Sequence, residues 1–205
     1  MYIPKLYRNH ELPEIEKFLQ QHSFATLIST HEGKHWATHL PLELEVNAQG
    51  EKVLWGHVSK ANPQWKTFPE NKEVMAVFLG PHAYISASWY DHVNVPTWNY
   101  IAVHVYGRIK LLEGEQLQEA LRRLVNKYEV HSKNPVSMDT MPKEFVKKEM
   151  KGVVGFEISI DRMEGAWKLS QNRNDANFQQ IITELENLNN INASQVADEM
   201  KKMRP

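Results

Sequence analysis

The sequence predicts an α+β fold that is mainly β, with an antiparallel barrel and peripheral helices. Six short segments rich in β-branched and aromatic residues follow one another, and turn residues such as Gly80-Pro81 separate several of them. Six strands in succession favour an antiparallel barrel over alternating βαβ units. The strands are expected at residues 24–30, 36–46, 52–58, 73–79, 83–89 and 100–112.

Helical patterns flank these strands. The first helix is predicted over Glu11 to His22, where apolar residues share one face and Pro13 stands in the first turn. A second helix is predicted over 114–129, and a short charged helix is expected to end near Gly152. One further strand is expected at 153–165, where β-type residues return.

The C-terminal segment, 175–205, is predicted to form two helices with apolar residues at helical spacing. The second helix is expected to begin near Asn192 or Ser194. We interpret this segment as a docking element that belongs to the same domain as residues 1–174, the barrel itself.

Composition excludes several classes of function. The formal net charge of −1 provides no overall field that would recruit polyanions or anionic membranes. The chain has no cysteine, which excludes disulfides and thiolate metal sites and fits a reducing cytosol. Residues 1–14 lack the apolar core of a signal peptide, and no apolar run approaches the length of a membrane span. We therefore expect a cytoplasmic protein without a membrane partner.

The common catalytic and metal-binding motifs are missing from the sequence. Neither GxSxG nor a phosphate-binding GxxxxGK[ST] or GxGxxG pattern occurs. The ten histidines show no HExxH spacing, and His35 and His39 share a strand face where polar residues are expected to meet solvent or a partner. We predict no metal site, and no residue stands out as a catalytic acid or base.

One short segment, GHVSKANPQWKTF at 56–68, joins a strand end to a helix start. Asn62-Pro63 is typical of such a start, because Asn caps the helix and Pro occupies its first turn. A helix N-terminus flanked by donors can bind a phosphate, but this stretch alone favours an ordinary capped connection. The side chains concerned are His57, Ser59, Lys60, Asn62, Gln64 and Trp65.

A second donor-rich segment, WKLSQNR at 167–173, follows the strand predicted at 153–165. It contains no acid and offers the side chains of Lys168, Ser170, Gln171 and Arg173. In isolation, these donors suit a nucleic-acid backbone as well as the phosphate and ring edges of a small cofactor. The low net charge of the chain and the barrel that precedes the segment favour the cofactor.

Several segments together resemble the PaiB family, bacterial proteins described as FMN-binding negative transcriptional regulators. The resemblance covers nearly the whole chain in the family's order and spacing. It implies a six-stranded Greek-key split barrel of the pyridoxamine-phosphate-oxidase-like group, a homodimer, and FMN bound in clefts at the dimer interface. The segments are YIP (2–4), ATHLPL (37–42), GHVSKANPQW (56–65), GPHAYISASWY (80–90), VPTWNYIAVHVYG (95–107), VVGFEI (153–158) and KLSQNR (168–173).

The resemblance also implies where the phosphate of FMN binds. The short phosphate-binding helix of split barrels matches residues 62–68, with Asn62 and Gln64 where related proteins have a serine and a lysine. Without that lysine, the phosphate charge is left to Lys60, to helix N–H groups, or to the cations of WKLSQNR. His39 and His57 are expected to line the site, and the two tryptophans expected to offer stacking surfaces are Trp65 and Trp98.

We therefore expect an FMN-binding protein that acts as a negative transcriptional regulator through its flavin, with a second copy as partner. The alternative is a flavin-dependent oxidoreductase without direct DNA binding. DNA as a partner lacks a clear motif, because the tail cations Lys201, Lys202 and Arg204 stand among acids. The spacing of Met200 and Met203 is also typical of packing.

Overall fold

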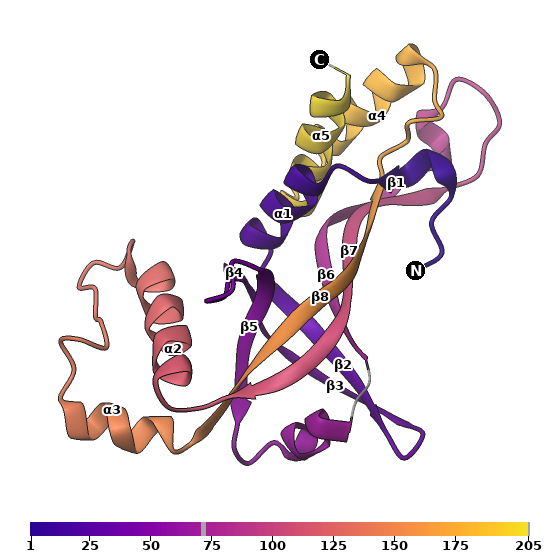
Figure 1. The fold of residues 1–205 in the computed structure, drawn as a ribbon. Coiled ribbons are helices and arrows are strands. Elements are labelled where there is room, and N and C mark those ends of the chain that lie inside the picture. Colours follow the sequence, from indigo (N-terminus) through magenta and orange to yellow (C-terminus); the bar gives the residue numbers. More distant parts are fainter. Residues whose placement is uncertain (71–72, 205) are drawn as a thin grey trace. The chain divides into compact units, whose positions relative to one another are not determined.

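The computed structural model describes residues 1–70 and 73–204, in which eight strands form one hydrogen-bonded sheet. The strands and helices are labelled in Figure 1. The strands are β1 (Arg8–Asn9), β2 (Phe24–His31), β3 (Lys34–Pro41), β4 (Glu43–Val46), β5 (Lys52–Ser59), β6 (Val74–Ile85), β7 (Thr97–Leu112) and β8 (Val153–Lys168). Their order is β3-β2-β6-β7-β8-β5-β4, and β1 pairs with β8. β2 pairs antiparallel with β3 and β6, and β5 pairs antiparallel with β4 and β8.

Several strand boundaries differ from the prediction. The separate strand expected at 83–89 is wrong, because its first residues belong to β6 and Ala87–Trp89 form the 3₁₀ helix η3. The segment expected as one strand, 36–46, is interrupted at Leu42, whose N–H donates to the carbonyl of Ser23 at 2.8 Å instead of continuing the ladder. The turn expected at Gly80-Pro81 is wrong, because β6 continues through it. Burial alternates on both sides of Gly80-Pro81 but shifts by one residue there. Gly80 permits this irregularity, since a Cβ would lie 2.5 Å from the ring of Phe18.

The helices follow the predicted pattern closely. They are α1 (Leu12–Gln21), α2 (Gly114–Glu129), α3 (Lys143–Met150), α4 (Asp175–Asn187) and α5 (Ile191–Met203), with three short 3₁₀ helices η1 (Lys5–Tyr7), η2 (Pro63–Glu70) and η3 (Ala87–Trp89). α5 begins slightly before the predicted position, because Asn190 caps it by accepting a hydrogen bond from the N–H of Ala193 at 3.1 Å. In the described ranges, no helix combines the length and apolar character that crossing a membrane requires.

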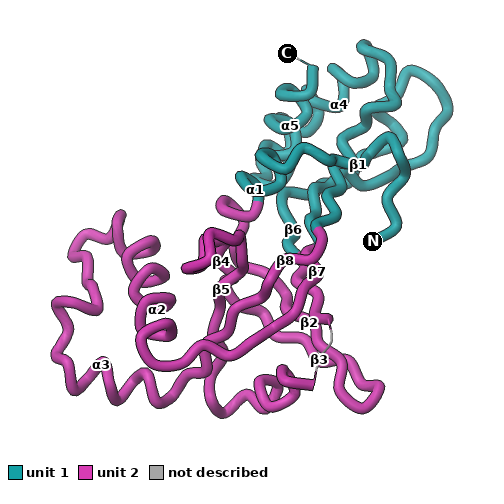
Figure 2. Tube along the Cα trace, in the orientation of Figure 1, with its two compact units in different colours: residues 1–18, 78–104, 163–205 teal, residues 19–77, 105–162 magenta. Residues whose placement is uncertain are grey.

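The chain divides into two compact units, drawn in different colours in Figure 2. Unit 1 comprises residues 1–18, 78–104 and 163–205, and unit 2 comprises residues 19–77 and 105–162. The long strands β6, β7 and β8 contribute residues to both units. The tail predicted as a docking element therefore belongs to unit 1, together with the N-terminal residues and the middle of the chain.

Each unit has its own apolar core. In unit 2, the ring of Phe68 from η2 meets Phe156 of β8 edge-on, with centroids 5.3 Å apart. Further side chains of this core are Leu27, Leu40, Leu42, Leu54, Val58, Val105 and Ile158. In unit 1, α4 and α5 lie side by side and bury their apolar faces (Figure 1), and the side chains concerned are Phe178, Ile181, Ile182, Leu185, Val196, Ala197 and Met200.

Candidate functional site

The connection from β5 to η2 in unit 2 forms the helix start that the sequence predicts. The carbonyl of the Asn62 side chain accepts a hydrogen bond from the N–H of Gln64 at 3.0 Å. Its amide donates to Oγ1 of Thr38 on β3 at 2.9 Å. Asn62 therefore caps η2 and fastens it to the sheet, as Asn does at helix N-termini.

Gln64, a predicted cofactor-binding residue, points into the interior of unit 2. Its side chain is 0% exposed. Thr38 donates to its Oε1 at 2.5 Å, and its Nε2 donates to the hydroxyl of Ser29 at 3.0 Å. A chain of hydrogen bonds thus runs from Asn62 through Thr38 and Gln64 to Ser29. The amide of Gln64 forms hydrogen bonds with buried polar groups of β2 and β3 and so holds the start of η2 in place. Gln64 would therefore act on a ligand only indirectly, through the position of η2.

Lys60 and Trp65 are the predicted site residues of this segment that face outward. Lys60 is exposed, and its N–H donates to the carbonyl of Gly152 at 2.8 Å. Trp65 is half-buried, and its indole Nε1 donates to the carbonyl of Lys60 at 3.0 Å. The segment therefore presents the exposed side chain of Lys60 near the indole ring of Trp65.

His39 and His57 lie apart from this group. Successive residues of a strand face opposite sides of the sheet, so His39 is on the other face of β3 from Thr38, where its Nδ1 and the hydroxyl of Thr26 are 2.9 Å apart. His57 lies with Trp55 and Leu121 in the lining of a hollow of about 20 Å³ beneath α2, room for about one water molecule. Burial lowers the pKa of His57, so its imidazole is neutral at pH 7.

In unit 1, β8 ends in a tight turn, Lys168 to Arg173, which we call the cationic turn. Ser170 has a φ of 61°, and its hydroxyl donates to the buried side-chain carbonyl of Asn99 at 3.1 Å. The side-chain carbonyl of Gln171 accepts the N–H of Leu169 at 2.8 Å. Two predicted ligand donors, Ser170 and Gln171, therefore make contacts that fix the shape of this turn.

The two cations of this turn have no carboxylate partner among the described residues. Lys168 donates to Oγ1 of Thr97 at 2.5 Å, and the guanidinium carbon of Arg173 lies 4.7 Å from the ring centre of Tyr90. Burial lowers the pKa of Lys168, and the nearby charge of Arg173 lowers it further. Two like charges held close together in a partly buried position favour the binding of an anion.

Two polar atoms beside this turn are buried without a hydrogen-bond partner in residues 1–70 and 73–204: the hydroxyl of Tyr90 and Nε of Arg173. Tyr90 is only 8% exposed. Leaving such a group unsatisfied costs about 1–3 kcal/mol. Two cations and a phenol with unused donors fit the phosphate of a mononucleotide, so these residues match the group that the resemblance implies.

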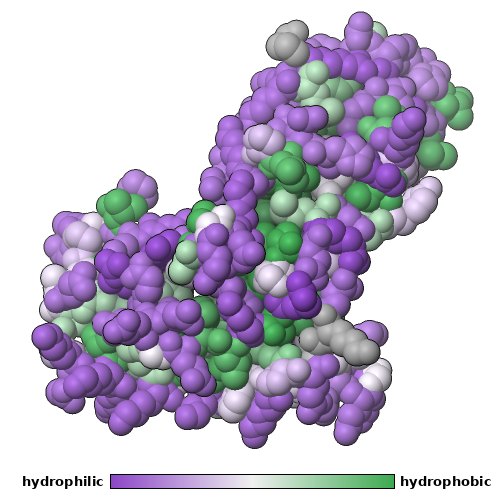
Figure 3. All heavy atoms as spheres, viewed as in Figure 1, coloured by the Kyte–Doolittle hydropathy of each residue, from purple (hydrophilic) through white to green (hydrophobic). Residues whose placement is uncertain are grey.

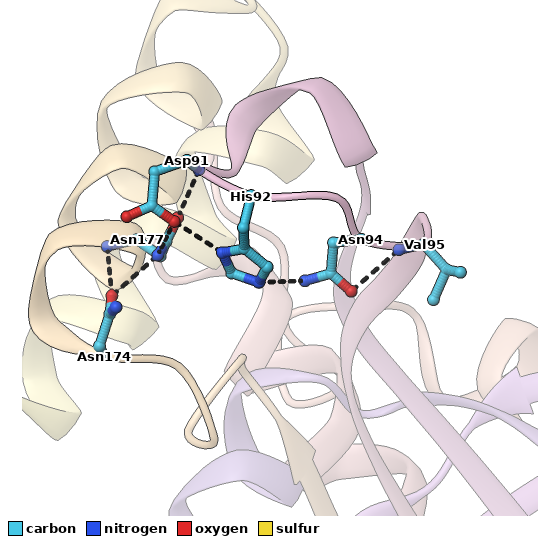
Figure 4. Close-up of polar contacts among 6 residues, drawn as sticks. All are labelled: Asp91, His92, Asn94, Val95, Asn174 and Asn177. Atoms are coloured by element: carbon cyan, nitrogen blue, oxygen red, sulfur yellow. Dashed lines mark hydrogen bonds and ion pairs between the residues drawn. The ribbon is translucent and has the colours of Figure 1, made fainter.

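A network of hydrogen bonds fixes both sides of this cluster (Figure 4). Asp91, next to Tyr90, accepts a bond from the amide of Asn177 at 2.8 Å, and its N–H donates to the carbonyl of the same side chain at 3.1 Å. The Asn177 amide also donates to Asn174, next to Arg173, at 2.9 Å. The buried Asn177 thereby joins the loop after η3 to the start of α4.

An exposed apolar face lies on β6 and β7 of unit 1. Trp98 is 52% exposed, and its ring lies 6.1 Å from His82 and 6.0 Å from Tyr84, centre to centre. The alternation of buried and exposed residues along β6 shifts by one residue at Gly80-Pro81. The exposed Leu79 therefore lies on the same side of the sheet as His82 and Tyr84. We call Leu79, His82, Tyr84 and Trp98 the aromatic face. Hydrophobic residues reach the surface of both units in Figure 3, so exposure alone does not assign a ligand to Trp98.

Sequence reasoning missed four residues that shape the connection from β5 to η2 and the cationic turn. Thr38 and Asn177 occupy ordinary strand and helix positions and bear on the groups only through long-range hydrogen bonds. Tyr90 stands in the segment SASWY, where an aromatic residue is typical of a core. Thr97 begins β7 and reaches Lys168 from 71 residues away in the sequence. The only local signal is that Thr38, Tyr90 and Thr97 lie within segments of the family resemblance.

Comparisons with known proteins agree with this architecture. Residues 1–162 match a family model described as "Putative FMN-binding domain". The chain is 45% identical to the Protease synthase and sporulation protein PAI 2 of Bacillus subtilis over 201 residues, which cover 98% of this chain and 97% of that protein.

Two solved structures share the fold. One is the FAD and heme binding protein from Mycobacterium smegmatis, with a TM-score of 0.59, 12% identity and coverage of 79% of this chain and 73% of that one. The other is the flavocytochrome Anf3 from Azotobacter vinelandii, with a TM-score of 0.58, 18% identity and coverage of 81% and 72%. The predicted fold class, an α+β, mainly β split barrel, is confirmed, with eight strands in place of six.

The burial of Gln64 generates a prediction. The substitution Gln64→Lys, which restores the lysine of related proteins, is expected to lower the free energy of unfolding by about 3 kcal/mol, because it places an unpaired charge beside Ser29 and Thr38. Urea unfolding measures this loss. Lys60→Gln, an exposed change, is the control and should shift stability by less than about 0.5 kcal/mol. Unchanged stability of Gln64→Lys would contradict the buried position.

Proposed function

Since the chain belongs to the PaiB family of FMN-binding-domain proteins, we propose that it binds FMN. The observation that carries this proposal is the cationic turn. Among residues 1–70 and 73–204, its two cations Lys168 and Arg173 have no carboxylate partner, and two buried donors beside them have no hydrogen-bond partner. A flavin requires an apolar slot for its ring and positive charge for its phosphate. When bound, FMN would supply one- or two-electron redox chemistry.

Each unit offers its own set of candidate contacts for the flavin, and we propose them as two separate sets. In unit 2, Lys60 and Trp65 offer charge and a ring beside the capped start of η2, while Asn62 and Gln64 hold that start in position. In unit 1, Lys168 and Arg173 offer charge, Trp98 offers a stacking surface, and Ser170 and Gln171 keep the turn in shape. His39 and His57 are peripheral in this proposal, because the first bonds to Thr26 and the second lies beneath α2.

The proposal predicts that FMN binds in a saturable way. Titration of the purified chain with FMN should quench flavin fluorescence and shift the visible absorption bands, because the ring leaves water for an apolar slot. One of the two substitutions Trp98→Ala and Trp65→Ala should weaken binding about tenfold or more, and that tryptophan is the one that contacts the ring. At a protein concentration of about 100 µM, even weak binding of FMN would be detected. Flavin fluorescence that stays unquenched at that concentration would contradict the proposal.

We also propose that the protein forms a homodimer through the aromatic face. An apolar patch with Tyr84 47% exposed and Trp98 52% exposed is typical of a protein–protein contact. Sedimentation velocity should give a dimer, and Tyr84→Glu should weaken association at least about tenfold because it places a charge in the contact. Leu188→Glu, a substitution of an equally exposed leucine at the end of α4, is the control. A monomer at all concentrations would contradict this proposal.

We propose further that the protein acts as a negative regulator of transcription through its flavin and not through its helical tail. The support for regulation is the name of the Bacillus subtilis relative, a sporulation protein. Against contact between the tail and DNA, α5 buries Val196 and Met200 in the core of unit 1. Its cations are paired within the chain: Lys201 with Glu186, Lys202 with Glu199, and Arg204 with Asp175.

Gel retardation of promoter fragments tests this assignment. Any retardation should depend on added FMN and should persist in the double variant Lys201→Ala/Lys202→Ala, because those cations already have acidic partners. Loss of retardation in the double variant, with FMN binding intact, would instead identify the tail as the DNA contact.

A further inference from the structure

Four side chains of unit 1 carry donors or charges that the protein leaves unused or only partly used: Tyr90, Thr97, Lys168 and Arg173. They come from three places in the chain: the residue after η3, the start of β7 and the cationic turn after β8. We propose that these four side chains form a binding site for a phosphate group, built wholly within unit 1. Tyr90 and Thr97 are new members of this site, and the start of η2 is not part of it.

Charge is the first step of the argument. Lys168 and Arg173 stand in the same short turn, where burial lowers the pKa of Lys168 and the charge of Arg173 lowers it further. Neither cation has an ion-pair partner in the described part of the chain. The acid beside Tyr90 is Asp91, whose Oδ1 is bound by Asn177 and by Nδ1 of His92 at 2.6 Å. An oxyanion bound between the two cations would offset their mutual repulsion. No carboxylate of the described residues plays this part.

Geometry of the donors is the second step. The guanidinium of Arg173 stacks on the ring of Tyr90, and its Nε–H is buried without a hydrogen-bond partner among residues 1–70 and 73–204. The hydroxyl of Tyr90 is likewise buried without a partner in those ranges. Thr97 already accepts from Lys168 and still has its own hydroxyl proton to donate. Ammonium, guanidinium and hydroxyl donors together match the several oxygen atoms of a phosphate.

The third step is preorganisation. Asn177 links Asp91 to Asn174, so the neighbours of Tyr90 and of Arg173 are held together before any ligand arrives (Figure 4). Arg204 donates to the carbonyls of Gln171 and Arg173 at 2.9 and 3.0 Å. Those carbonyls of the turn would otherwise be free to repel an anion. Binding to donors that are already fixed costs little conformational entropy.

The phosphate has two sources that the same chemistry would recognise. One is the phosphate ester of FMN, and this source rests on the proposed function. The other is a separate phosphate-bearing molecule that binds beside the flavin or without it. The two sources differ in whether loss of the site lowers the affinity for FMN, so one set of variants distinguishes them.

The first arm uses inorganic phosphate as probe and titration calorimetry of the full chain at constant ionic strength. We expect Arg173→Ala to weaken phosphate binding roughly 10- to 100-fold, because it removes a charge-assisted contact. Tyr90→Phe should weaken it roughly 3- to 10-fold while keeping the ring on which Arg173 stacks. Arg173→Lys should restore part of the loss. Lys17→Ala, which removes an exposed charge from α1, is the control and should change binding less than about twofold.

The second arm compares FMN with riboflavin, which lacks the phosphate. If the site holds the flavin phosphate, Arg173→Ala lowers the affinity for FMN and not for riboflavin, and phosphate competes with FMN alone. If the site holds a separate ligand, FMN-saturated protein still binds phosphate and Arg173→Ala leaves the affinity for FMN unchanged. Absence of flavin binding with phosphate binding intact overturns the proposed function and leaves the phosphate site standing.

The phosphate site itself is overturned by one pattern of results. Arg173→Ala and Tyr90→Phe, both folded by circular dichroism, would then match the unchanged chain in phosphate titrations and in the ratio of FMN to riboflavin affinity. The phosphate site is also overturned if the unchanged chain binds no phosphate and all variants bind FMN with equal affinity.

Discussion

The proposed binding site depends on one electrostatic constraint. Two cations of unit 1, Lys168 and Arg173, lie in the same turn, and neither has a carboxylate partner among the described residues. Like charges held close together in a partly buried place are unfavourable unless an anion binds between them. Burial lowers the pKa of Lys168, and the charge of Arg173 lowers it further. None of the described residues places a carboxylate there. Instead the protein stacks Arg173 on Tyr90 and binds Lys168 to a hydroxyl. An anionic ligand is the partner that this arrangement lacks.

The surroundings of these cations are organised to keep them in place. Ser170 adopts a left-handed conformation that costs about 1–2 kcal/mol for a residue with a side chain, and its bond to Asn99 offsets part of that cost. Asn177, almost fully buried, holds the two flanking segments together. In unit 2, the hydrogen-bond chain through Thr38 and Gln64 does the same for the start of η2. Rigid supports of this kind are characteristic of binding sites rather than of ordinary loops.

The sequence predicted most elements because their signals are local. The apolar spacing of α2 and the Asn-Pro start of η2 depend on neighbours in the chain, and both predictions are confirmed. The turn expected at Gly80-Pro81 failed because Gly80 accommodates the ring of Phe18, a contact invisible in the sequence. For the same reason, a polar residue such as Gln64 was predicted to face a ligand although its partners in β2 and β3 draw it inside. Burial of polar groups is decided by tertiary structure, which local patterns do not encode.

The protonation of Lys168 tests the central claim most directly. With lysine labelled at Cε with carbon-13, nuclear magnetic resonance follows the titration of Lys168 with and without inorganic phosphate, and Lys168→Ala assigns the signal. The pKa of Lys168 should lie below the ordinary lysine value in the free protein, because of burial and Arg173, and should rise when phosphate binds. A pKa of Lys168 that does not change with phosphate would contradict an anion site at the cationic turn.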